Sequence, residues 1–378
     1  MAMAGEMPTS SPSVSACMVV RNEARFLESC LRSVRDLVDE IVVGDTGSTD
    51  RTPEIAHDLG AKLCRIPWKE DFSAARNQVL EKAKGTWILS IDADERLRPI
   101  SRSQIELSLQ DTSHIAYHVL MYPMRQWTGM WAIRLFRNHP LIRFNGIFHE
   151  TLWEGLQKAC SPDTKDIGFS ELVLDHLGYD IDQANKLARN CALLLKEVQR
   201  NPRNAYAWIH LGLIYEDLGE DSRAEGSWRK AIQIIRERKD IKPHETYAYI
   251  CYIEWGLRQE RPVRGLLEEA MAYSPENPYL HWLEGRLLMD EGRHDEAIPF
   301  FERLLLWGEK RDFNRMSICY PTGIFDIDAC DSLATCHFRL GNYPESRRYF
   351  QLAQKFAPEC MEYKVKTQLC EAMMQTAD

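Results

Sequence analysis

The chain has 378 residues, 27% of them charged, and a formal net charge of -9. A chain of this length is typical of two domains, each able to bury its own hydrophobic core. The acidic balance argues against a surface that binds nucleic acid or anionic lipid, and no apolar run approaches the roughly 20 residues that a membrane-spanning helix needs.

The 11 cysteines are scattered along the chain and contain no C-x-x-C pair. An odd, irregular set of this kind is typical of reduced thiols in a cytoplasmic protein, and not of a disulfide framework or a zinc site. Residues 1–13 are rich in Ser, Pro and Met and have neither a basic flank nor an apolar run. We therefore expect a disordered tail there and not a signal peptide.

From residue 14 to about residue 91, short β-branched runs alternate with amphipathic stretches, which predicts βαβ units and a mostly parallel sheet. The predicted strands are Ala16–Val20, Ile41–Val43, Lys62–Ile66 and Trp87–Ile91. The predicted helices are Phe26–Val38, Pro53–Leu59 and Ala74–Lys84. In open sheets of this kind, ligands bind beyond the carboxyl ends of the strands. We therefore expect the loops Arg21–Glu23, Asp45–Ser48 and Asp92–Asp94 to share one rim.

The last of these strands delivers two carboxylates, Asp92 and Asp94, one residue apart. Residues spaced by two on a strand point to the same face, so both side chains can address one ion. Mg²⁺ and Mn²⁺ prefer oxygen ligands and are usually completed by substrate phosphates and water. The pair is consistent with a site for a diphosphate leaving group, although acidic pairs at strand ends are also common as solvated turn residues.

Two aromatic, strand-like pieces follow, Ile115–Tyr122 and Trp131–Phe136, and we assign them to the same domain. From residue 181 the chain reads as consecutive helices with a repeat near 34 residues. The unit at 205–238 carries the pattern of a tetratricopeptide repeat, with Trp208, Leu211, Gly212, Tyr215, Ala224, Trp228 and Ala231. Degenerate units in the same phase are predicted at 244–277, 278–311 and 327–360, with a capping helix at 361–378.

Six segments, taken together, resemble the ordered motifs of family-2 glycosyltransferases with the GT-A fold. They are Val19–Glu23, Asp45–Asp50, Phe72–Asn77, Asp92–Glu95, Phe144–Glu150 and His176–Tyr179. With the repeats that follow, the chain is similar to the subgroup that includes bacterial peptide S-glycosyltransferases of the sublancin-modifying type. The resemblance implies an α/β nucleotide-diphospho-sugar transferase domain, Rossmann-like with a mostly parallel sheet, over residues 14–180. An all-α tetratricopeptide-repeat solenoid is then expected over residues 181–378.

The resemblance also implies a donor site. The expected donor-binding residues are Asn22, Glu23, Asp45, Ser48, Arg76, Asn77 and Asp92. Among them, Asp45 would accept a hydrogen bond from the nucleotide base and Asp92 would hold the ribose side of the donor. Asp94 would bind the Mg²⁺ or Mn²⁺ that bridges the two phosphates, while Arg76 and Asn77 would face the diphosphate and the sugar.

Glu150 is the candidate for the base that removes the acceptor proton, a role typically worth 10² to 10⁴-fold in rate. The alternative is that Glu150 pairs with Arg143 or Arg134 and only shapes the wall of the site. His176 is a candidate third metal ligand beside Asp92 and Asp94, the alternative being a hydrogen-bonded packing residue.

We therefore expect a metal-dependent, inverting glycosyltransferase that uses a nucleotide-diphosphate sugar, by expectation a UDP-sugar. The acceptor would be a Ser, Thr or Cys side chain of a peptide or protein held by the repeats, whose concave surfaces commonly bind extended chains. Two alternatives stay open: transfer to lipopolysaccharide or cell-wall carbohydrate, and a catalytically inactive scaffold built on the repeats. Whether the chain forms a homodimer is also open.

Overall fold

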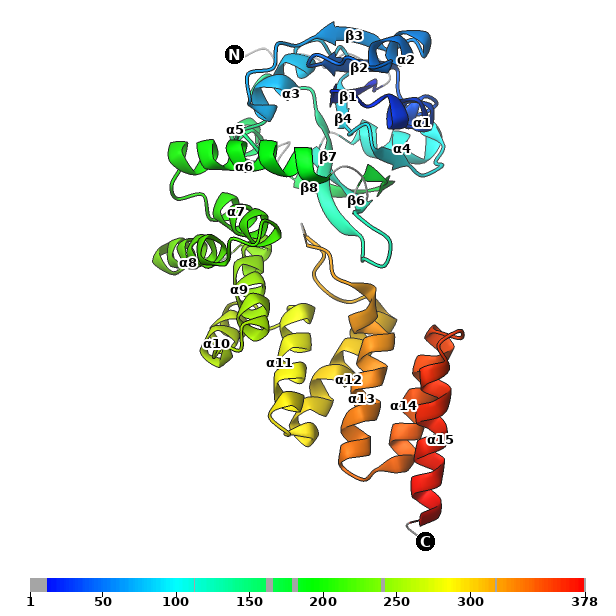
Figure 1. The fold of residues 1–378 in the computed structure, drawn as a ribbon. Helices are drawn as coiled ribbons and strands as arrows, with labels where there is room; N and C mark the ends of the chain where they lie inside the picture. The colour runs from blue at the N-terminus through cyan, green and yellow to red at the C-terminus, as the bar shows by residue number, and fades with distance from the viewer. Residues whose placement is uncertain are drawn as a thin grey trace, which may run out of the picture. The chain divides into compact units, whose positions relative to one another are not determined.

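The computed structural model describes residues 12–111, 113–160, 166–178, 183–238, 242–316 and 318–376. Residues 1–11 of the predicted tail 1–13 therefore lie outside the described residues. The chain divides into two compact units (Figure 1). The first consists of Met1–Met124 and Gly129–Ala207, and the second of Arg125–Thr128 and Trp208–Asp378. None of the described helices combines the length and the apolar character of a membrane-spanning segment.

The described part of the first unit contains an eight-stranded sheet in the order β3-β2-β1-β4-β7-β6-β8-β5. The strands are β1 (Val14–Val20), β2 (Glu40–Asp45), β3 (Lys62–Arg65), β4 (Trp87–Ser90), β5 (Glu95–Leu97), β6 (His114–Tyr122), β7 (Met130–Arg137) and β8 (Asp166–His176). Strands β3, β2, β1 and β4 are parallel neighbours, as the βαβ pattern predicts. β7 pairs antiparallel with β4 and β6, and β8 pairs parallel with β6 and antiparallel with β5.

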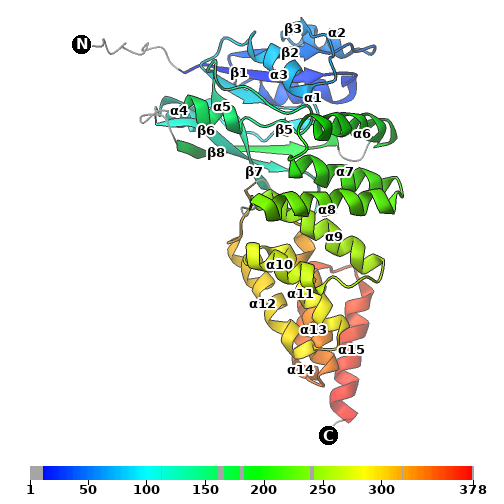
Figure 2. The ribbon, with the colours of Figure 1, turned by 90° about the vertical axis from the view of Figure 1, so that its left-hand side faces the viewer.

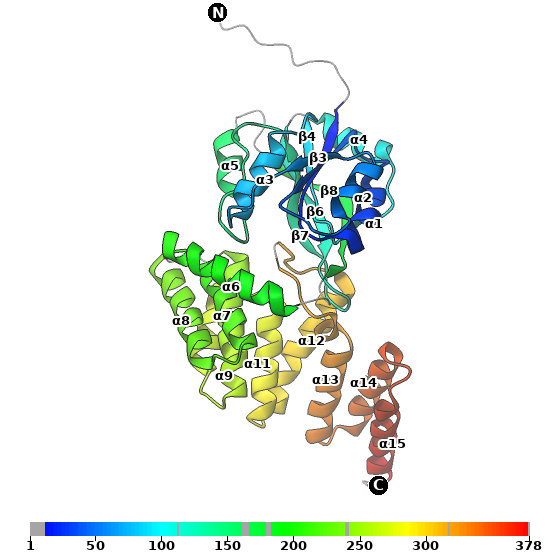
Figure 3. The ribbon, with the colours of Figure 1, turned by 45° about the horizontal axis from the view of Figure 1, so that its top comes forward.

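Helices cover both faces of this sheet, as Figure 3 shows. One face is covered by α1 (Ala24–Val34), α2 (Thr52–Asp58) and α4 (Arg102–Gln110), and the other by α3 (Phe72–Leu80) and α5 (Trp153–Ala159). Because side chains alternate along a strand, β1 sends Ala16 and Met18 to the core with Leu27 of α1, and Cys17 to the core with Val79 of α3. Two hydrophobic layers therefore fix the sheet and the loops at its edge.

The helix α6 (Gln183–Arg200) belongs to the first unit, which extends to Ala207 and so passes the boundary expected at residue 180. The physical reason is a set of polar contacts from the end of this helix. Lys196 pairs with Glu70, and Glu197 accepts a hydrogen bond from the backbone of Ile147.

The described part of the second unit is built mainly from helices that pack against their neighbours in chain order (Figure 2). They are α7 (Ala205–Asp217, which begins in the first unit), α8 (Asp221–Arg238), α9 (Tyr247–Arg258), α10 (Arg264–Tyr273), α11 (Pro278–Asp290), α12 (His294–Lys310), α13 (Ile327–Arg339), α14 (Tyr343–Phe356) and α15 (Met361–Thr376). Two short 3₁₀ turns, Pro243–Thr246 and Thr322–Phe325, precede α9 and α13.

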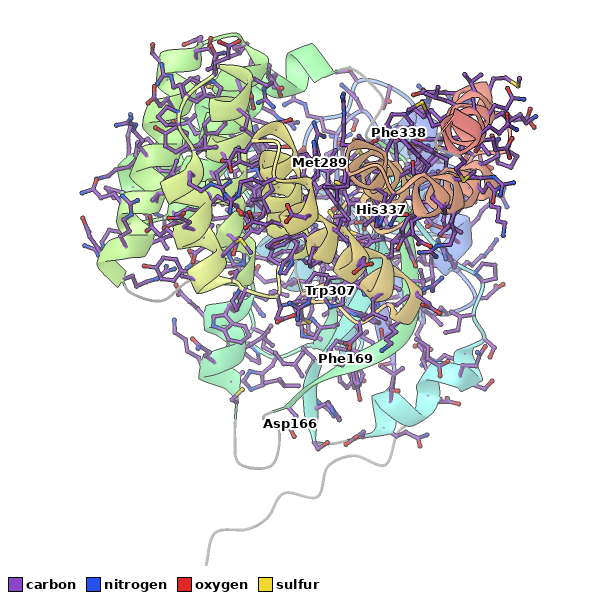
Figure 4. All side chains as sticks on the ribbon, turned by 90° about the horizontal axis from the view of Figure 1, so that it is seen from below. Asp166, Phe169, Met289, Trp307, His337 and Phe338 are labelled. Atoms are coloured by element: carbon purple, nitrogen blue, oxygen red, sulfur yellow. The ribbon has the colours of Figure 1, made fainter. Side chains whose placement is uncertain are left out.

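Close helix contacts in this unit depend on small residues opposite large ones. A Cβ at Gly212 would clash with the buried indole of Trp228, and a Cβ at Gly285 would lie 2.6 Å from the ring of Phe301. Further along, α12 and α13 lie side by side, and Figure 4 labels Trp307 on the first of them. Because Gly212 and Gly285 have no side chain, the paired helices can approach closely. Stacked helical repeats bury their faces by such close packing.

Candidate active site

The carboxyl ends of β1, β2 and β4 lie at one edge of the sheet. Val20 at the end of β1 is in register with Asp45 at the end of β2, and Cys17 is in register with Ser90 at the end of β4. The backbone N–H of Ile91 donates to the carbonyl of Cys17 at 3.2 Å, which prolongs this alignment to the start of the acidic turn. The three loops that follow these strands therefore share the expected rim.

Arg76 connects two parts of this rim. It lies on α3, and its Nη2 donates to Oδ1 of Asp92 at 2.7 Å while its Nε donates to the carboxylate of Glu150. Burial by itself would lower the pKa of Arg76, but the charges of Asp92 and Glu150 outweigh burial and raise it. The guanidinium is therefore a permanent positive charge between two carboxylates. The partner of Glu150 is thus Arg76, while Arg143 donates to the carbonyls of His139 and Ile142.

A second arginine and a buried acid hold Asp92 from the other side. Arg134 on β7 lies 3.4 Å from Oδ2 of Asp92 and donates to Oε1 of Glu95 at 2.7 Å. Glu95 is fully buried, and its Oε2 accepts the backbone N–H of Asp92 at 2.8 Å. The carboxylate and the backbone of Asp92 are therefore both fixed.

The pKa values of Asp92 and Glu95 are shifted in opposite directions in this cluster. Burial would raise the pKa of Asp92, but Arg76 and Arg134 outweigh it and hold that pKa well below its usual range. For Glu95, burial prevails over Arg134, and with the repulsion from Asp92 it raises the pKa to about 7. Neither Glu95 nor Arg134 is among the residues expected to bind the donor. Glu95 directly follows the D-x-D motif, so its position in the sequence could have identified it as a site residue. Arg134 reaches the site only through the pairing of β7 with β4, which no local motif indicates.

Asp94 lies beside His176. His176 Nε2 is 3.4 Å from Asp94 Oδ2, and the N–H of Leu177 donates to the carbonyl of Asp94 at 2.8 Å. A Cβ at Gly178 would clash with the carboxylate of Asp94, so only glycine leaves room for it. Burial would lower the pKa of His176, but its hydrogen bond to Asp94 and the acidic charges nearby raise it.

Two of the three expected metal ligands therefore lie together. Across the described residues, no group of three or more His, Cys, Asp or Glu side chains is gathered as a ligand set. The carboxylate of Asp92 is engaged by Arg76 and Arg134, whereas Asp94 offers an oxygen and His176 a nitrogen ligand. A divalent cation that completes its shell with phosphate oxygens and water needs only one or two protein carboxylates, which Asp94 can supply. His176 can add a nitrogen ligand once it gives up the proton that it shares with Asp94. The three-ligand set stays a prediction.

Polar contacts tie the loops after β1 and β2 to each other. Asp45 accepts hydrogen bonds from the hydroxyl and the backbone N–H of Ser48, the latter at 3.1 Å. The Ser48 hydroxyl in turn accepts the N–H of Asn22 at 2.9 Å, and Asn22 Oδ1 accepts the N–H of Thr49 at 2.8 Å. Asn22 has a φ of 58°, in the left-handed region that Asn tolerates better than most residues. Asp45, Ser48 and Asn22 are thus brought together, with the Asp45 carboxylate engaged in the turn.

Two further donor-site candidates make structural contacts. The amide of Asn77 binds the backbone of Phe144 twice: its Nδ2 donates to the carbonyl, and its Oδ1 accepts the N–H, each at 2.9 Å. The backbone N–H of Glu23 donates to the hydroxyl of Thr52 at 2.8 Å. Asn77 therefore fixes the chain just before the segment that carries Glu150.

That segment, residues 145–151, forms a closed loop. Asn145 and Thr151 exchange two backbone hydrogen bonds at its base, each 2.9 Å long. His149, next to Glu150, has a φ of 55°. Partial desolvation of its ring lowers the pKa of His149, against the opposing charge of Glu150, although the residue as a whole is exposed. The loop is thus compact, with Ile147 buried at its apex and His149 exposed.

Comparisons with known proteins agree with these features. Residues 15–156 match the model of glycosyl transferase family 2, and residues 264–315 match that of a tetratricopeptide repeat. A TPR repeat-containing protein of Synechococcus elongatus is 37% identical over 227 residues, which are 57% of this chain and 55% of the relative. The SPbeta prophage-derived glycosyltransferase SunS of Bacillus subtilis is 28% identical over 249 residues, which are 63% of this chain and 57% of the relative.

The chain thus matches little more than half the length of these relatives. Among solved structures, residues 1–349 of TarS from S. aureus, in complex with UDP-GlcNAc, align with a TM-score of 0.40 and 14% identity. That alignment covers 66% of this chain and 92% of the other.

The match to the family 2 model contains the acidic turn, Arg76, Arg134 and Glu150, and it ends before His176 and α6. The repeat model matches a segment that lies within the helices of the second unit. The chain therefore carries a glycosyl transferase family 2 domain at residues 15–156, combined with tetratricopeptide repeats.

Proposed function

We propose that this chain is a glycosyltransferase that moves a sugar from a nucleotide-diphosphate donor to an acceptor by single displacement with inversion. The observation that carries the proposal is the position of Arg76, which holds Asp92 and Glu150 at the carboxyl edge of a family 2 domain. In such sheets this edge is where nucleotide ligands bind. A donor-side and an acceptor-side carboxylate then face one reaction centre.

The donor would lie across the rim, with its diphosphate next to Asp94 and His176. These two side chains would hold Mg²⁺ or Mn²⁺, which, when bound, screens the charge that accumulates on the departing diphosphate. Gly178 keeps the space that the Asp94 carboxylate needs. Arg76 and Arg134 would keep Asp92 in place for the ribose side of the donor. Asn22, Glu23, Asp45, Ser48 and Asn77 complete the proposed donor site.

Glu150 would take the proton of the acceptor during attack from the face opposite the diphosphate. Its contact with Arg76 and the closed loop that carries it would fix the direction of its carboxylate. A displacement that uses a base and forms no covalent glycosyl intermediate inverts the anomeric centre. General-base assistance is worth 10² to 10⁴-fold, which is what we assign to Glu150.

For the substrates, we propose a UDP-sugar donor and a Ser, Thr or Cys side chain of a peptide or protein acceptor. The tetratricopeptide repeats support a peptide, because concave repeat surfaces commonly hold extended chains. The resemblance to peptide S-glycosyltransferases supports it as well. A cytoplasmic location, expected from the scattered cysteines, belongs to the same proposal.

Donor binding tests the proposal without knowledge of the acceptor. A ligand that binds only the folded state raises the melting temperature with its concentration. UDP and GDP, each with and without Mn²⁺, should be compared in the wild type, in Asp94→Asn and in the control Asp175→Asn. Asp175 lies on β8 and pairs with Arg98, whereas the contact of Asp94 is with His176.

We expect a shift with UDP and Mn²⁺ in the wild type and in the control, and a loss of the Mn²⁺-dependent part in Asp94→Asn. A chain that responds to neither nucleotide is the result expected of an inactive scaffold. A shift with UDP that Mn²⁺ and Asp94→Asn leave unchanged would instead remove the metal from the proposal.

A further inference from the structure

Glu197 on α6 is a buried carboxylate whose side chain uses both of its oxygens. The residue is 3% exposed. Its Oε2 accepts the backbone N–H of Ile147 at 2.9 Å, and its Oε1 accepts Nδ2 of Asn204 at 2.9 Å. A buried acid with two directed hydrogen bonds fixes what it touches, because both bonds would be lost in a low-dielectric surrounding if it moved.

The group that Glu197 holds is the apex of the loop 145–151. Ile147 is nearly fully buried, and its carbonyl accepts the N–H of Phe72 at the start of α3 at 3.0 Å. The carbonyl of Gly146 accepts the hydroxyl of Ser73. The loop is therefore anchored by α3 through its carbonyls and by α6 through an N–H. Glu197 is the acceptor on the α6 side.

The same loop carries Glu150, three residues after Ile147. The base of the loop is closed between Asn145 and Thr151, so a displacement at its apex must be absorbed within a few residues. One of these is His149, whose φ of 55° is uncommon for a residue with a side chain. A shift of Ile147 would therefore alter the position of Glu150 against Arg76.

Other contacts fix α6 itself to the first unit. Lys196 pairs with Glu70, Arg200 Nη1 lies 3.9 Å from Asp71 Oδ2, and the guanidinium of Arg189 lies 5.6 Å from the ring centre of Phe72. Residues 70–72 immediately precede and begin α3. The helix is thus attached at the place where α3 also holds the loop.

We propose that Glu197 is a positioning residue for Glu150, acting through the backbone N–H of Ile147, and that α6 is therefore a working part of the glycosyltransferase domain. The link to catalysis rests on the proposed function of Glu150. The link between Glu197 and the loop does not. The two are tested by different measurements on the full chain.

Hydrogen exchange at the Ile147 amide tests the structural link. Glu197→Ala removes the acceptor and should speed exchange in peptides that contain residues 145–149 by about tenfold or more, because the amide loses its bond and opens locally. Glu197→Gln keeps one oxygen for the N–H of Ile147 but turns its NH₂ toward Nδ2 of Asn204, so its exchange should lie between the wild type and Glu197→Ala. The matched control is Lys196→Gln, which breaks a neighbouring α6 contact without touching the loop.

Asn204→Asp provides a second variant if Glu197→Ala does not fold. It retains a carboxylate oxygen for the N–H of Ala207 and places a negative charge against Oε1 of Glu197. We expect faster exchange at residues 145–149 here too. If residues 145–149 exchange at the wild-type rate in Asn204→Asp, and in Glu197→Ala where that variant folds, Glu197 does not hold the loop 145–151.

A double-mutant cycle tests the catalytic link. The substrate is whichever of UDP-glucose, UDP-GlcNAc or GDP-mannose is turned over fastest with Mn²⁺, and the readout is release of the nucleoside diphosphate. Glu197→Ala should lower kcat by about 10- to 100-fold with little change in the donor KM, because the loop acts on the base and not on donor binding. In a Glu150→Gln background the same change should cost only about twofold, since residues that act as one unit are not additive.

If the kcat losses of Glu197→Ala and Glu150→Gln multiply fully in the variant that carries both changes, Glu197 does not act through Glu150 and the positioning role is overturned. A Glu150→Gln variant with unchanged kcat would overturn the proposed function of Glu150, and with it the catalytic link of Glu197. The exchange result then still decides whether Glu197 holds the loop. The two failures are therefore distinguishable.

Discussion

At the scale of single residues, the rim is organised by arginines that each touch two acids. Arg76 binds Asp92 and Glu150, and Arg134 binds Asp92 and Glu95. Planar guanidinium groups can serve two acceptors in a fixed geometry, which a lysine cannot do in the same way. The acidic turn after β4 is thereby held rigid, so donor groups that approach it meet a preformed surface.

Gly178 gives a prediction at this scale. In Gly178→Ala the new Cβ would meet the carboxylate of Asp94, which must then turn away from His176. We expect nucleotide-sugar turnover with Mn²⁺ to fall by about tenfold or more, measured as release of nucleoside diphosphate, with the far-UV circular dichroism unchanged. Gly226→Ala is the matched control, because open space surrounds Gly226. Equal turnover in the two variants would show that the Asp94 position does not matter to the reaction.

Motifs in the sequence identify residues that a single segment carries. Asp92 and Asp94 follow a buried strand, and Glu150 belongs to a recognisable segment, so these three residues could be singled out as site candidates. Arg134 and Glu197 could not, because each reaches the site through tertiary pairing: one across the antiparallel β4–β7 ladder, the other from a helix 50 residues away from the Ile147 it binds. Nothing local in their sequence marks them.

At the scale of elements, the loop 145–151 and the helices around it determine where Glu150 lies. The ring of His149 lies 4.3 Å from that of Phe148 and 5.3 Å from that of Tyr206, while the residue as a whole is exposed. An imidazole whose pKa is lowered on folding links the stability of the loop to pH. The direction of that link follows from its lowered pKa.

The second prediction is acid sensitivity of the first unit. The pKa of His149 falls from 6.5 to about 4 on folding, so the unfolded chain binds a proton at a pH where the folded chain does not. The corresponding stability is present above pH 6.5 and is lost as the pH falls toward 4. Because His149 is exposed, solvent screens this effect, and we expect the loss between pH 7 and pH 5 to be no more than about 1 kcal/mol.

The measurement is the melting temperature of the full chain from pH 7 to pH 5, compared with His149→Asn. Asn keeps the left-handed backbone conformation and removes the titrating group. We expect the variant to show a smaller decrease on acidification than the wild type. Parallel curves for the two proteins would mean that His149 does not titrate in this way.

The sequence predicts the elements unevenly. The strands and helices between residues 14 and 91 follow from alternating β-branched runs and amphipathic stretches. Neither β5 nor β8 was predicted: β5 has three residues directly after the acidic turn, and β8 mixes charged and apolar residues along DIGFSELVLDH. The pattern predicts α6 as a helix but not its place in the first unit, because its amphipathic period resembles that of the repeat helices that follow.

At the scale of the whole molecule, the two units have separate tasks in the proposed function, the first in chemistry and the second in holding the acceptor. The third prediction concerns where the first unit ends. A fragment of residues 12–207 retains α6, Glu197 and Asn204, whereas a fragment of residues 12–179 leaves the Ile147 amide without Glu197. We expect the longer fragment to fold and to bind UDP with Mn²⁺ like the full chain.

The shorter fragment should melt at a lower temperature or aggregate, because a buried N–H without an acceptor costs about 1–3 kcal/mol. Thermal melting with and without nucleotide, on both fragments side by side, measures this. Identical melting and nucleotide response in the two fragments would return the boundary to residue 180.

Single displacement with inversion is tested most directly by the anomeric configuration of the released sugar, followed by proton NMR. The full chain should be incubated with Mn²⁺ and an α-linked donor such as UDP-glucose, in water, so that no acceptor needs to be known. We expect slow release of UDP and of sugar that appears first as the β anomer, before mutarotation mixes the two forms. In Glu150→Gln the release should fall by about two orders of magnitude. Sugar that appears first as the α anomer would rule out inversion, and a Glu150→Gln variant as fast as the wild type would rule out Glu150 as the base.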